Sequence, residues 1–253
     1  MPQYSLARHV FVCLQGEHVV FLDVRKDRYF ALEAARTAGL GELITGWPVP
    51  SPDDAVYARH TADGGVPGIS GAADLGALSS VVALLTEKEI LTPSAAAGKS
   101  ATPVSSGPPR FDLVADALDG RVEVGVTGFL RFVLAAIRAA LILKIRSFES
   151  AVERVRSRVA AAQGRHEPFD SERVHHLVGV FSLLRPFFFT SKDACLFDAL
   201  ALSEFLAGYR IYPNWVFAVQ ARPFAAHCWL QLGDVVLNDT VDHVKRYTPI
   251  MVV

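Results

Sequence analysis

A segment poor in large apolar side chains divides the sequence in two, and this division constrains the fold more than any other feature. Residues 92–110 (TPSAAAGKSATPVSSGPPR) are rich in Pro, Ser, Gly and Ala and contain a single valine. Because such a segment cannot bury a hydrophobic core, it is expected to be a flexible linker. The 253 residues are therefore predicted to form two domains, residues 1–91 and residues 111–253.

The first domain has the pattern of a small sheet followed by helices. Runs of β-branched and aromatic residues at 9–14, 19–24 and 28–32 are separated by turn-like segments, which predicts a three-stranded meander. Apolar residues then recur at helical spacing in 33–45 and 75–90. The sequence predicts an α+β module.

The second domain also mixes helices and strands. Apolar and β-branched runs predict helices at 111–117 and 196–207, one long helix or two with a bend at 128–162, and strands at 215–220, 226–232 and 235–240. We therefore expect an α+β fold here too, in which a helix precedes three strands.

Charge and cysteine usage exclude several classes of protein. The 25 Lys and Arg nearly cancel the 26 Asp and Glu, so no global field attracts nucleic acid, and the basic stretch 131–165 is interpreted as a solvated helix face.

Charged residues interrupt the apolar segment 125–145, so no membrane partner is predicted. Three cysteines, an odd number, argue against a disulfide framework, and with no signal peptide visible they predict a cytoplasmic protein.

Cys195 is the first residue that suggests chemistry. With Ser191 as a candidate N-cap, Cys195 falls in the first turn of the predicted helix, where unpaired N–H groups and the helix dipole favour a thiolate. A buried, unreactive cysteine is the more common reading of such a position taken alone.

The strands downstream add partners for this thiol. His227 and a polar pair, Asn238 and Asp239, follow Cys195 in the order used by papain-like and transglutaminase-like folds. There a histidine takes the thiol proton and a third group orients the imidazole. A two-residue hairpin loop would favour Asn238 as that group and a three-residue loop would favour Asp239, and the pattern alone does not decide. A carboxylate stabilises an imidazolium more strongly than an amide, so Asp239 is preferred and Asn238 is the alternative.

Strand alternation bears on Cys228. Neighbouring strand residues point to opposite faces, so Cys228 is expected to face away from Cys195 when His227 faces it. This argues against a metal site at these three residues, and no metal is predicted. Cys228 is expected to be a buried core thiol.

Several short motifs resemble one known family. They are the Cys-Leu that opens a helix, the Pro-Phe-x-x-His-x-Trp segment around His227, the Asn-Asp pair and the terminal Tyr-Thr-Pro-Ile. Together they are similar to the lasso-peptide biosynthesis B protein, over residues 111–253. The resemblance implies a transglutaminase-like cysteine peptidase that removes the leader of a ribosomally made precursor, with Cys195, His227 and Asp239 as its triad. Many members have Ala where this chain has Cys228.

The resemblance also implies partners and leaves a cofactor open. A lasso cyclase would receive the product, and ATP could assist the reaction, although no P-loop pattern is present and the residues themselves indicate no cofactor.

The first domain is similar to the precursor-recognition element of peptide-modifying systems, a winged-helix-like fold. In that fold the leader adds as a strand beside the third strand and packs against the last helix. The implied leader-binding residues are Arg28, Tyr29, Phe30, Leu78, Val81, Val82 and Leu85. A DNA-binding winged helix is disfavoured, because residues 1–110 carry 9 basic and 11 acidic side chains.

Two other functions stay open at this point. An amine instead of water could intercept a thioester at Cys195, which would make the protein an amidotransferase or crosslinking enzyme. Alternatively, the protein could be a non-catalytic adaptor that presents a peptide to another enzyme.

Overall fold

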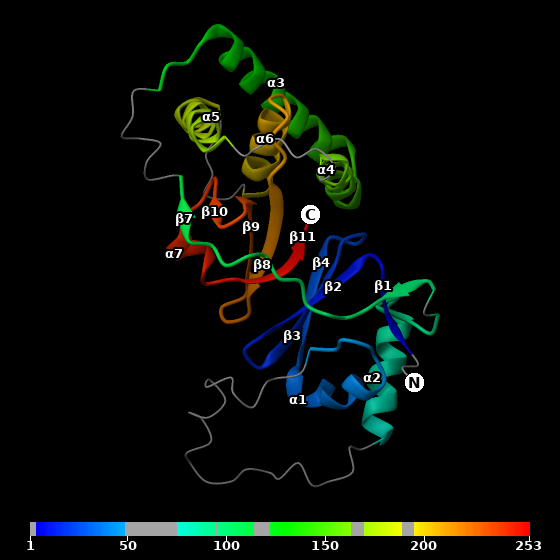
Figure 1. Ribbon diagram of the computed structural model, residues 1–253. Helices are drawn as coiled ribbons and strands as arrows, with labels where there is room; N and C mark the ends of the chain where they lie inside the picture. Colours follow the sequence, from blue (N-terminus) through cyan, green and yellow to red (C-terminus); the bar gives the residue numbers. More distant parts are fainter. Residues whose placement is uncertain (1–3, 49–74, 95, 114–121, 163–169, 189–194) are drawn as a thin grey trace. The chain divides into compact units, whose positions relative to one another are not determined.

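The computed structural model describes residues 4–48, 75–94, 96–113, 122–162, 170–188 and 195–253 (Figure 1). The chain divides into two compact units. The first contains Met1–Val104 with Ala221–Phe224, and the second contains Ser105–Gln220 with Ala225–Val253. Both mix helices and strands, as the sequence predicts.

The predicted meander is present in the first unit. Strands β2 (Val10–Gln15), β3 (His18–Asp23) and β4 (Arg28–Glu33) pair antiparallel in the order β2-β3-β4. The central strand β3 is almost wholly buried, and Phe21 stacks on Phe30 of β4 with ring centroids 4.5 Å apart. Alternating apolar residues on these strands therefore supply one side of the core.

The helices of this unit are shorter than the pattern suggests. The predicted helix over 33–45 is a single turn, α1 (Ala34–Thr37), followed by the 3₁₀ segment η1 (Ala38–Glu42). Helix α2 (Leu75–Glu87) matches its prediction closely and buries Val82 and Leu85 in the core.

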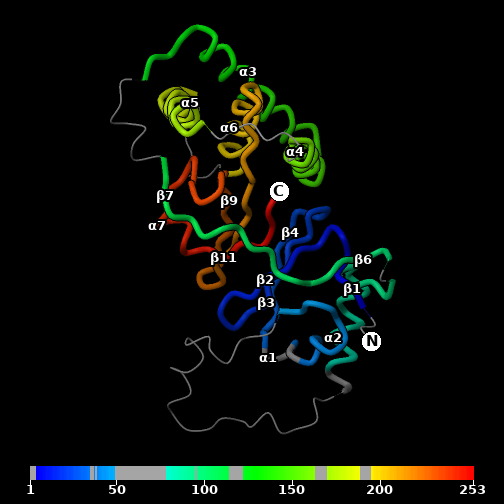
Figure 2. Tube along the Cα trace, in the orientation of Figure 1, coloured from blue at the N-terminus to red at the C-terminus, as the bar shows by residue number. Residues whose placement is uncertain are grey.

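The prediction that residues 92–110 form a flexible linker is wrong for the first part of this segment. Strand β1 (Ser5–Ala7), which the sequence analysis missed, pairs with β5 (Leu91–Thr92) and β6 (Gly98–Lys99), and β1 lies beside β6 in Figure 2. Ala101 is buried and its N–H donates to Thr45 O over 2.8 Å. Residues 92–104 belong to the first unit because backbone pairing, which needs no large side chains, holds them there.

The second unit is built on one five-stranded sheet, in the order β11-β8-β9-β10-β7. The central pair is β8 (Asn214–Gln220) and β9 (Ala225–Leu232), with Trp215 and Trp229 fully buried. The other strands are short: β7 (Phe111–Asp112), β10 (Val235–Val236) and β11 (Thr248–Val252).

The prediction of a helix at 111–117 is wrong where the structure describes it. Phe111 and Asp112 form β7, parallel to β10, and residues 114–117 lie outside the described part. Asp112 Oδ2 also accepts the Val241 N–H over 3.0 Å. Strand β7 is thus held by hydrogen bonds to a segment far away in the sequence, which the local pattern does not reveal.

Helices pack against this sheet through α6 (Cys195–Ala207), which contacts both β9 and helix α3 (Val126–Ile145) (Figure 1). Of the two alternatives for residues 128–162, the structure has two helices, because the chain is extended at Arg146 before α4 (Phe148–Ala162) begins. Helix α5 (Ser171–Leu184) and the 3₁₀ turn η3 (Arg185–Phe187) complete the layer. Edge-to-face contacts of Phe132 with Phe181 and Phe205 hold α3, α5 and α6 together.

Helix α3 is apolar on both faces. Its inner face buries Phe132, Ala135, Ala139 and Ile142, whereas Val126, Leu130, Ile137 and Ile145 on the other face are exposed. By length and composition α3 is the one helix in the described part of the chain that could cross a membrane.

Candidate active site

Cys195 is the first residue of α6, as its predicted place at a helix start requires. Its side chain is partly buried, and the proposed N-cap Ser191 lies outside the described residues. At this end of a helix the free N–H groups and the dipole favour an anionic sulfur.

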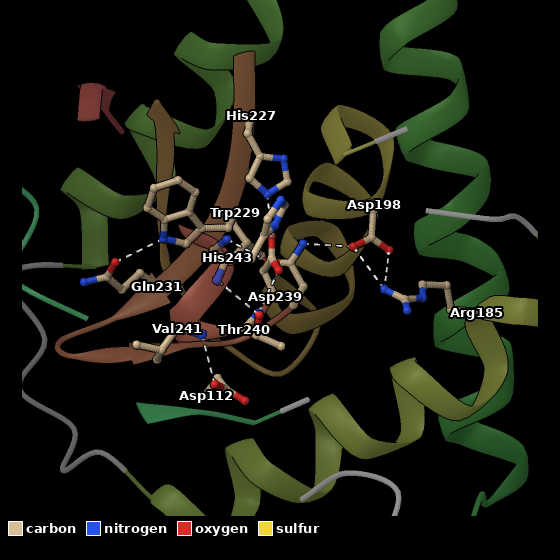
Figure 3. Close-up of polar contacts among 12 residues, drawn as sticks. Asp112, Arg185, Asp198, His227, Trp229, Gln231, Asp239, Thr240, Val241 and His243 are labelled. Atoms are coloured by element: carbon tan, nitrogen blue, oxygen red, sulfur yellow. Dashed lines mark hydrogen bonds and ion pairs between the residues drawn. The ribbon is translucent and has the colours of Figure 1, made fainter. Parts of the chain in front are cut away.

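His227 and Asp239 lie beside each other (Figure 3). His227 Nε2 donates a hydrogen bond to Asp239 Oδ2. The two side chains are 15% and 16% exposed. Because a carboxylate can only accept, Nε2 carries the proton in this bond. Hydrogen bonding and charge from Cys195 are also among the causes that raise the pKa of His227, so the thiol and the imidazole interact. The imidazole is thus coupled to the thiol electrostatically and to the carboxylate by a hydrogen bond.

The route by which Asp239 reaches His227 differs from the one expected. In the hairpin, Val235 pairs with Leu232 and Val236 with Gln231, which is the two-residue-loop register that favoured Asn238. However, β10 ends at Val236, so the register does not extend to 238–239. Asp239 accepts the Thr240 N–H over 2.7 Å just before the short helix α7 (Val241–Val244), and this turn brings its carboxylate to the imidazole.

Asn238 has a different set of partners. Its Oδ1 accepts the Leu230 N–H over 2.8 Å, and its Nδ2 donates to Asp198 Oδ2 over 2.8 Å. Asp198 is buried on α6, and Arg185 donates to both of its oxygens at 3.3 and 3.4 Å. Asn238 therefore ties β9 to α6, the two elements that carry His227 and Cys195.

His243 is a residue of this site that the sequence analysis missed. Its Nδ1 donates to Asp239 Oδ2 over 2.8 Å, and its ring lies 4.8 Å from that of His227, centroid to centroid (Figure 3). Tyr247 contacts both rings, at 5.2 Å from His227 and 5.4 Å from His243. The i,i+4 spacing of Asp239 and His243 across a helix start was the available signal.

Cys228 is buried on β9, as expected. It pairs with Phe217 of β8 and its neighbour His227 pairs with Ala218, so the two side chains point to opposite faces of the sheet. Hydrogen bonding from Cys228 is nevertheless the largest cause that lowers the pKa of Cys195. The expectation that Cys228 faces away from Cys195 stays a prediction.

These contacts polarise the site. Hydrogen bonds from Cys228 and then from His227, together with the charge of His227, outweigh burial and lower the pKa of Cys195 to about 4. Burial alone would lower the pKa of His227, but hydrogen bonds and charge from Asp239 and Cys195 raise it to about 9. Between these values the pair is a thiolate and an imidazolium, the reactive form of a cysteine nucleophile. In contrast, burial raises the pKa of Cys13 to about 12.

The predicted leader-binding residues lie in the first unit, but they do not form one surface. Leu78 and Val82 line a cavity of about 520 Å³ between α2 and η1, together with Tyr4 and Leu43. Leu85 is 1% exposed and belongs to the core, against which Phe30 and Val81 also pack. The remaining two, Arg28 and Tyr29, are on β4, which is an edge strand in the described part of the sheet.

One group of described side chains could hold a cation. The ligand atoms of His227, Asp239 and His243 lie within 4.8 Å of one another. However, the Oδ2 atom of Asp239 already accepts hydrogen bonds from both imidazoles, so a metal ion would have to displace them. The absence of a metal therefore stays a prediction.

In this fold, helix α6 carries the thiol, strand β9 carries the histidine, and the turn before α7 carries the acid, an arrangement typical of cysteine-nucleophile domains. Residues 133–252 match the transglutaminase-like superfamily, so this part of the chain is a transglutaminase-like domain, of a superfamily that includes cysteine peptidases and crosslinking enzymes. No curated protein and no solved structure matches the chain.

Proposed function

We propose that the protein is a cysteine peptidase that removes the leader from a lasso-peptide precursor. The observation that carries this proposal is the hydrogen bond between His227 and Asp239 within a transglutaminase-like domain, and the electrostatic interaction of His227 with Cys195 supports it. The motifs around Cys195 and His227, which resemble the lasso-peptide B protein, support the choice of substrate.

In the proposed reaction the Cys195 thiolate attacks the carbonyl carbon of the bond between leader and core. The His227 imidazolium donates its Nδ1 proton to the leaving amine, which frees the core peptide. The resulting thioester is hydrolysed by water, from which the neutral imidazole takes a proton. Asp239 keeps the Nε2 proton in place and stabilises the imidazolium throughout.

The first unit is proposed to bind the leader. Strand β4 is an edge strand of the described sheet, so its backbone can pair with an extended peptide, and the cavity beside α2 can accept an apolar side chain. Binding through this unit would raise the local concentration of the scissile bond at Cys195. A lasso cyclase is the proposed acceptor of the freed core.

The proposal is tested by mass spectrometry of a lasso-peptide precursor incubated with the wild type or with Cys195→Ala. Cleavage by the wild type alone is expected, and Cys13→Ala should cleave normally because Cys13 is buried in the other unit. Cleavage that persists in Cys195→Ala would reject the nucleophile.

Membership of a superfamily that includes crosslinking enzymes makes amine transfer the second candidate. The two reactions give different product masses, because hydrolysis adds water to the leader fragment whereas transfer adds the amine. Incubation with and without a primary amine distinguishes them.

A further inference from the structure

Asp198 is a buried carboxylate that the proposed peptidase reaction does not use. It lies on α6, in the helical turn that follows Cys195, and is 2% exposed. Arg185 donates to both of its oxygens, as Figure 3 shows, and Asn238 Nδ2 donates to Oδ2 over 2.8 Å. Burial opposes the charge of Asp198 and raises its pKa, so these donors compensate a charge that is unfavourable at this place.

The amide of Asn238 joins this carboxylate to the strand that carries His227. A backbone N–H can only donate and a carboxylate can only accept, so the amide presents its oxygen to Leu230 and its nitrogen to Asp198. An apolar side chain at 238 could make neither hydrogen bond. Asn238 therefore connects β9 with α6 in one fixed orientation.

This connection links the elements that carry the proposed triad. Cys195 lies one helical turn before Asp198 on α6. His227 lies on β9, the strand that Asn238 contacts. Asp239, which accepts from His227, directly follows Asn238 in the chain. Loss of the hydrogen bond between Asn238 and Asp198 is therefore expected to change how the thiol is placed relative to the imidazole.

We propose that Asn238 and Asp198 are positioning residues, whose hydrogen bond holds the Cys195 side chain within reach of the His227 imidazole. This role rests on the proposed function, because it assigns the pair to the same nucleophile. Neither residue transfers a proton in the reaction: an amide does not titrate, and Asp198 is paired with Arg185. The pair acts on Cys195 only through the placement of α6 against β9, and a small displacement of a reacting group is enough to lower its reactivity.

The test is the rate at which iodoacetamide alkylates Cys195 in the full-length protein at pH 6, followed on the tryptic peptide 193–210. At this pH a thiol that interacts with His227 is ionised, whereas an ordinary thiol is almost wholly protonated. Asn238→Ala and Asp198→Ala are each expected to slow alkylation by about tenfold, because a pKa one unit above the pH of the assay leaves about a tenth of the thiol ionised. The double variant should be no slower than either single variant, since both remove the same hydrogen bond.

Further variants separate positioning from a general loss of stability. Asp198→Asn keeps an oxygen that can accept from Asn238, so its alkylation should stay close to the wild-type rate. Glu204→Ala removes the ion pairs of α6 with α4 and should also keep the wild-type rate, although it lowers stability. Asn238→Ser is the milder second variant and should slow alkylation as Asn238→Ala does, since serine has no group at the position of Nδ2. Circular dichroism at pH 6 checks that each variant is folded.

Wild-type rates in the folded Asn238 variants would overturn the proposal, and so would an equal slowing in Glu204→Ala. Multiplied effects in the double variant would show that the two residues do not act through one hydrogen bond. The readout is thiol reactivity and needs no peptide substrate, so a failure of precursor cleavage is a separate result that concerns the proposed function.

Discussion

At the scale of single residues, one carboxylate oxygen serves two imidazoles. Asp239 Oδ2 accepts from His227 Nε2 and from His243 Nδ1, and both hydrogen bonds lower the pKa of Asp239 against the effect of burial. The hydrogen bond from His243 thus makes the Asp239 carboxylate less basic and also holds this carboxylate in position. We infer that His243 is a positioning residue that acts on His227 through Asp239.

Replacing His243 by Ala is expected to move the alkaline limb of the activity profile to higher pH. Without the second donor Asp239 is more basic, so it stabilises the His227 imidazolium more and raises the pKa of His227 further above about 9. The measurement is kcat against pH, with His176→Ala as control because His176 is exposed on α5. An unchanged limb would show that His243 has no effect on His227.

Asp239→Asn should have a larger effect of the opposite sign. The amide cannot neutralise the imidazolium, so the pKa of His227 falls and the alkaline limb moves down, with kcat lower by about 10²- to 10⁴-fold. Adding Asn238→Asp to the Asp239→Asn variant tests whether a carboxylate one residue earlier can restore kcat. No restoration is expected, because the side chain at 238 is directed to Leu230 and Asp198 rather than to His227.

At the scale of elements, a buried ion pair joins α4 to α6. Glu204 on α6 is 1% exposed at its side chain, and it accepts from Arg158 at 2.6 and 3.0 Å and from Arg154 at 3.1 Å. Burial opposes its ionisation, but the two arginines outweigh burial and lower its pKa. The pair fixes α4 against the helix that carries Cys195.

Glu204→Ala is expected to lower the free energy of unfolding by about 1–3 kcal/mol, because it removes charged hydrogen bonds to two guanidinium groups that are partly exposed to water. The lowered pKa means that the stabilisation is present above the unfolded-state pKa of a glutamate and is lost as the pH falls. Urea unfolding of the wild type and the variant at neutral and acid pH measures the loss of stability and its dependence on pH. Glu153→Ala is the control, since its pair with Arg156 is exposed and contributes about 0.5 kcal/mol or less.

The pairing of β6 with β1 predicts the effect of a larger residue at Gly98. An added Cβ there would lie 2.3 Å from Ser5 Cβ and 3.0 Å from Leu6 O, so Gly98→Ala should destabilise the first unit by about 1–3 kcal/mol. Thermal unfolding checks this prediction. At Gly107 an added Cβ would meet only Gly233 O, at 3.7 Å, so Gly107→Ala should leave stability nearly unchanged.

At the scale of the whole molecule, the sequence predicts elements better than it predicts what joins them. The meander of 10–33 and helix α2 follow from hydrophobic periodicity, which burial enforces locally. Strands β1, β6 and β7 are two or three residues long and depend on backbone pairing with distant segments. Such pairing leaves no periodic pattern in so short a stretch.

The candidate site shows the same division. Helix and strand patterns place Cys195 and His227 correctly on their elements. The position of Asp239 depends on where β10 ends, and that end is set by the turn into α7 rather than by strand alternation. His243 could not be assigned from the sequence because its role depends on the same turn.

The most direct test of the account is the pH dependence of alkylation of Cys195 by iodoacetamide, followed on peptide 193–210. The lowered pKa of Cys195 predicts that the rate of its alkylation rises through about pH 4 and reaches a plateau below neutral pH. At neutral pH this rate should far exceed that of Cys13, whose pKa is raised. His227→Ala should move this rise to higher pH. Alkylation of wild-type Cys195 that begins only above pH 8, as for an ordinary thiol, would contradict the thiolate–imidazolium pair.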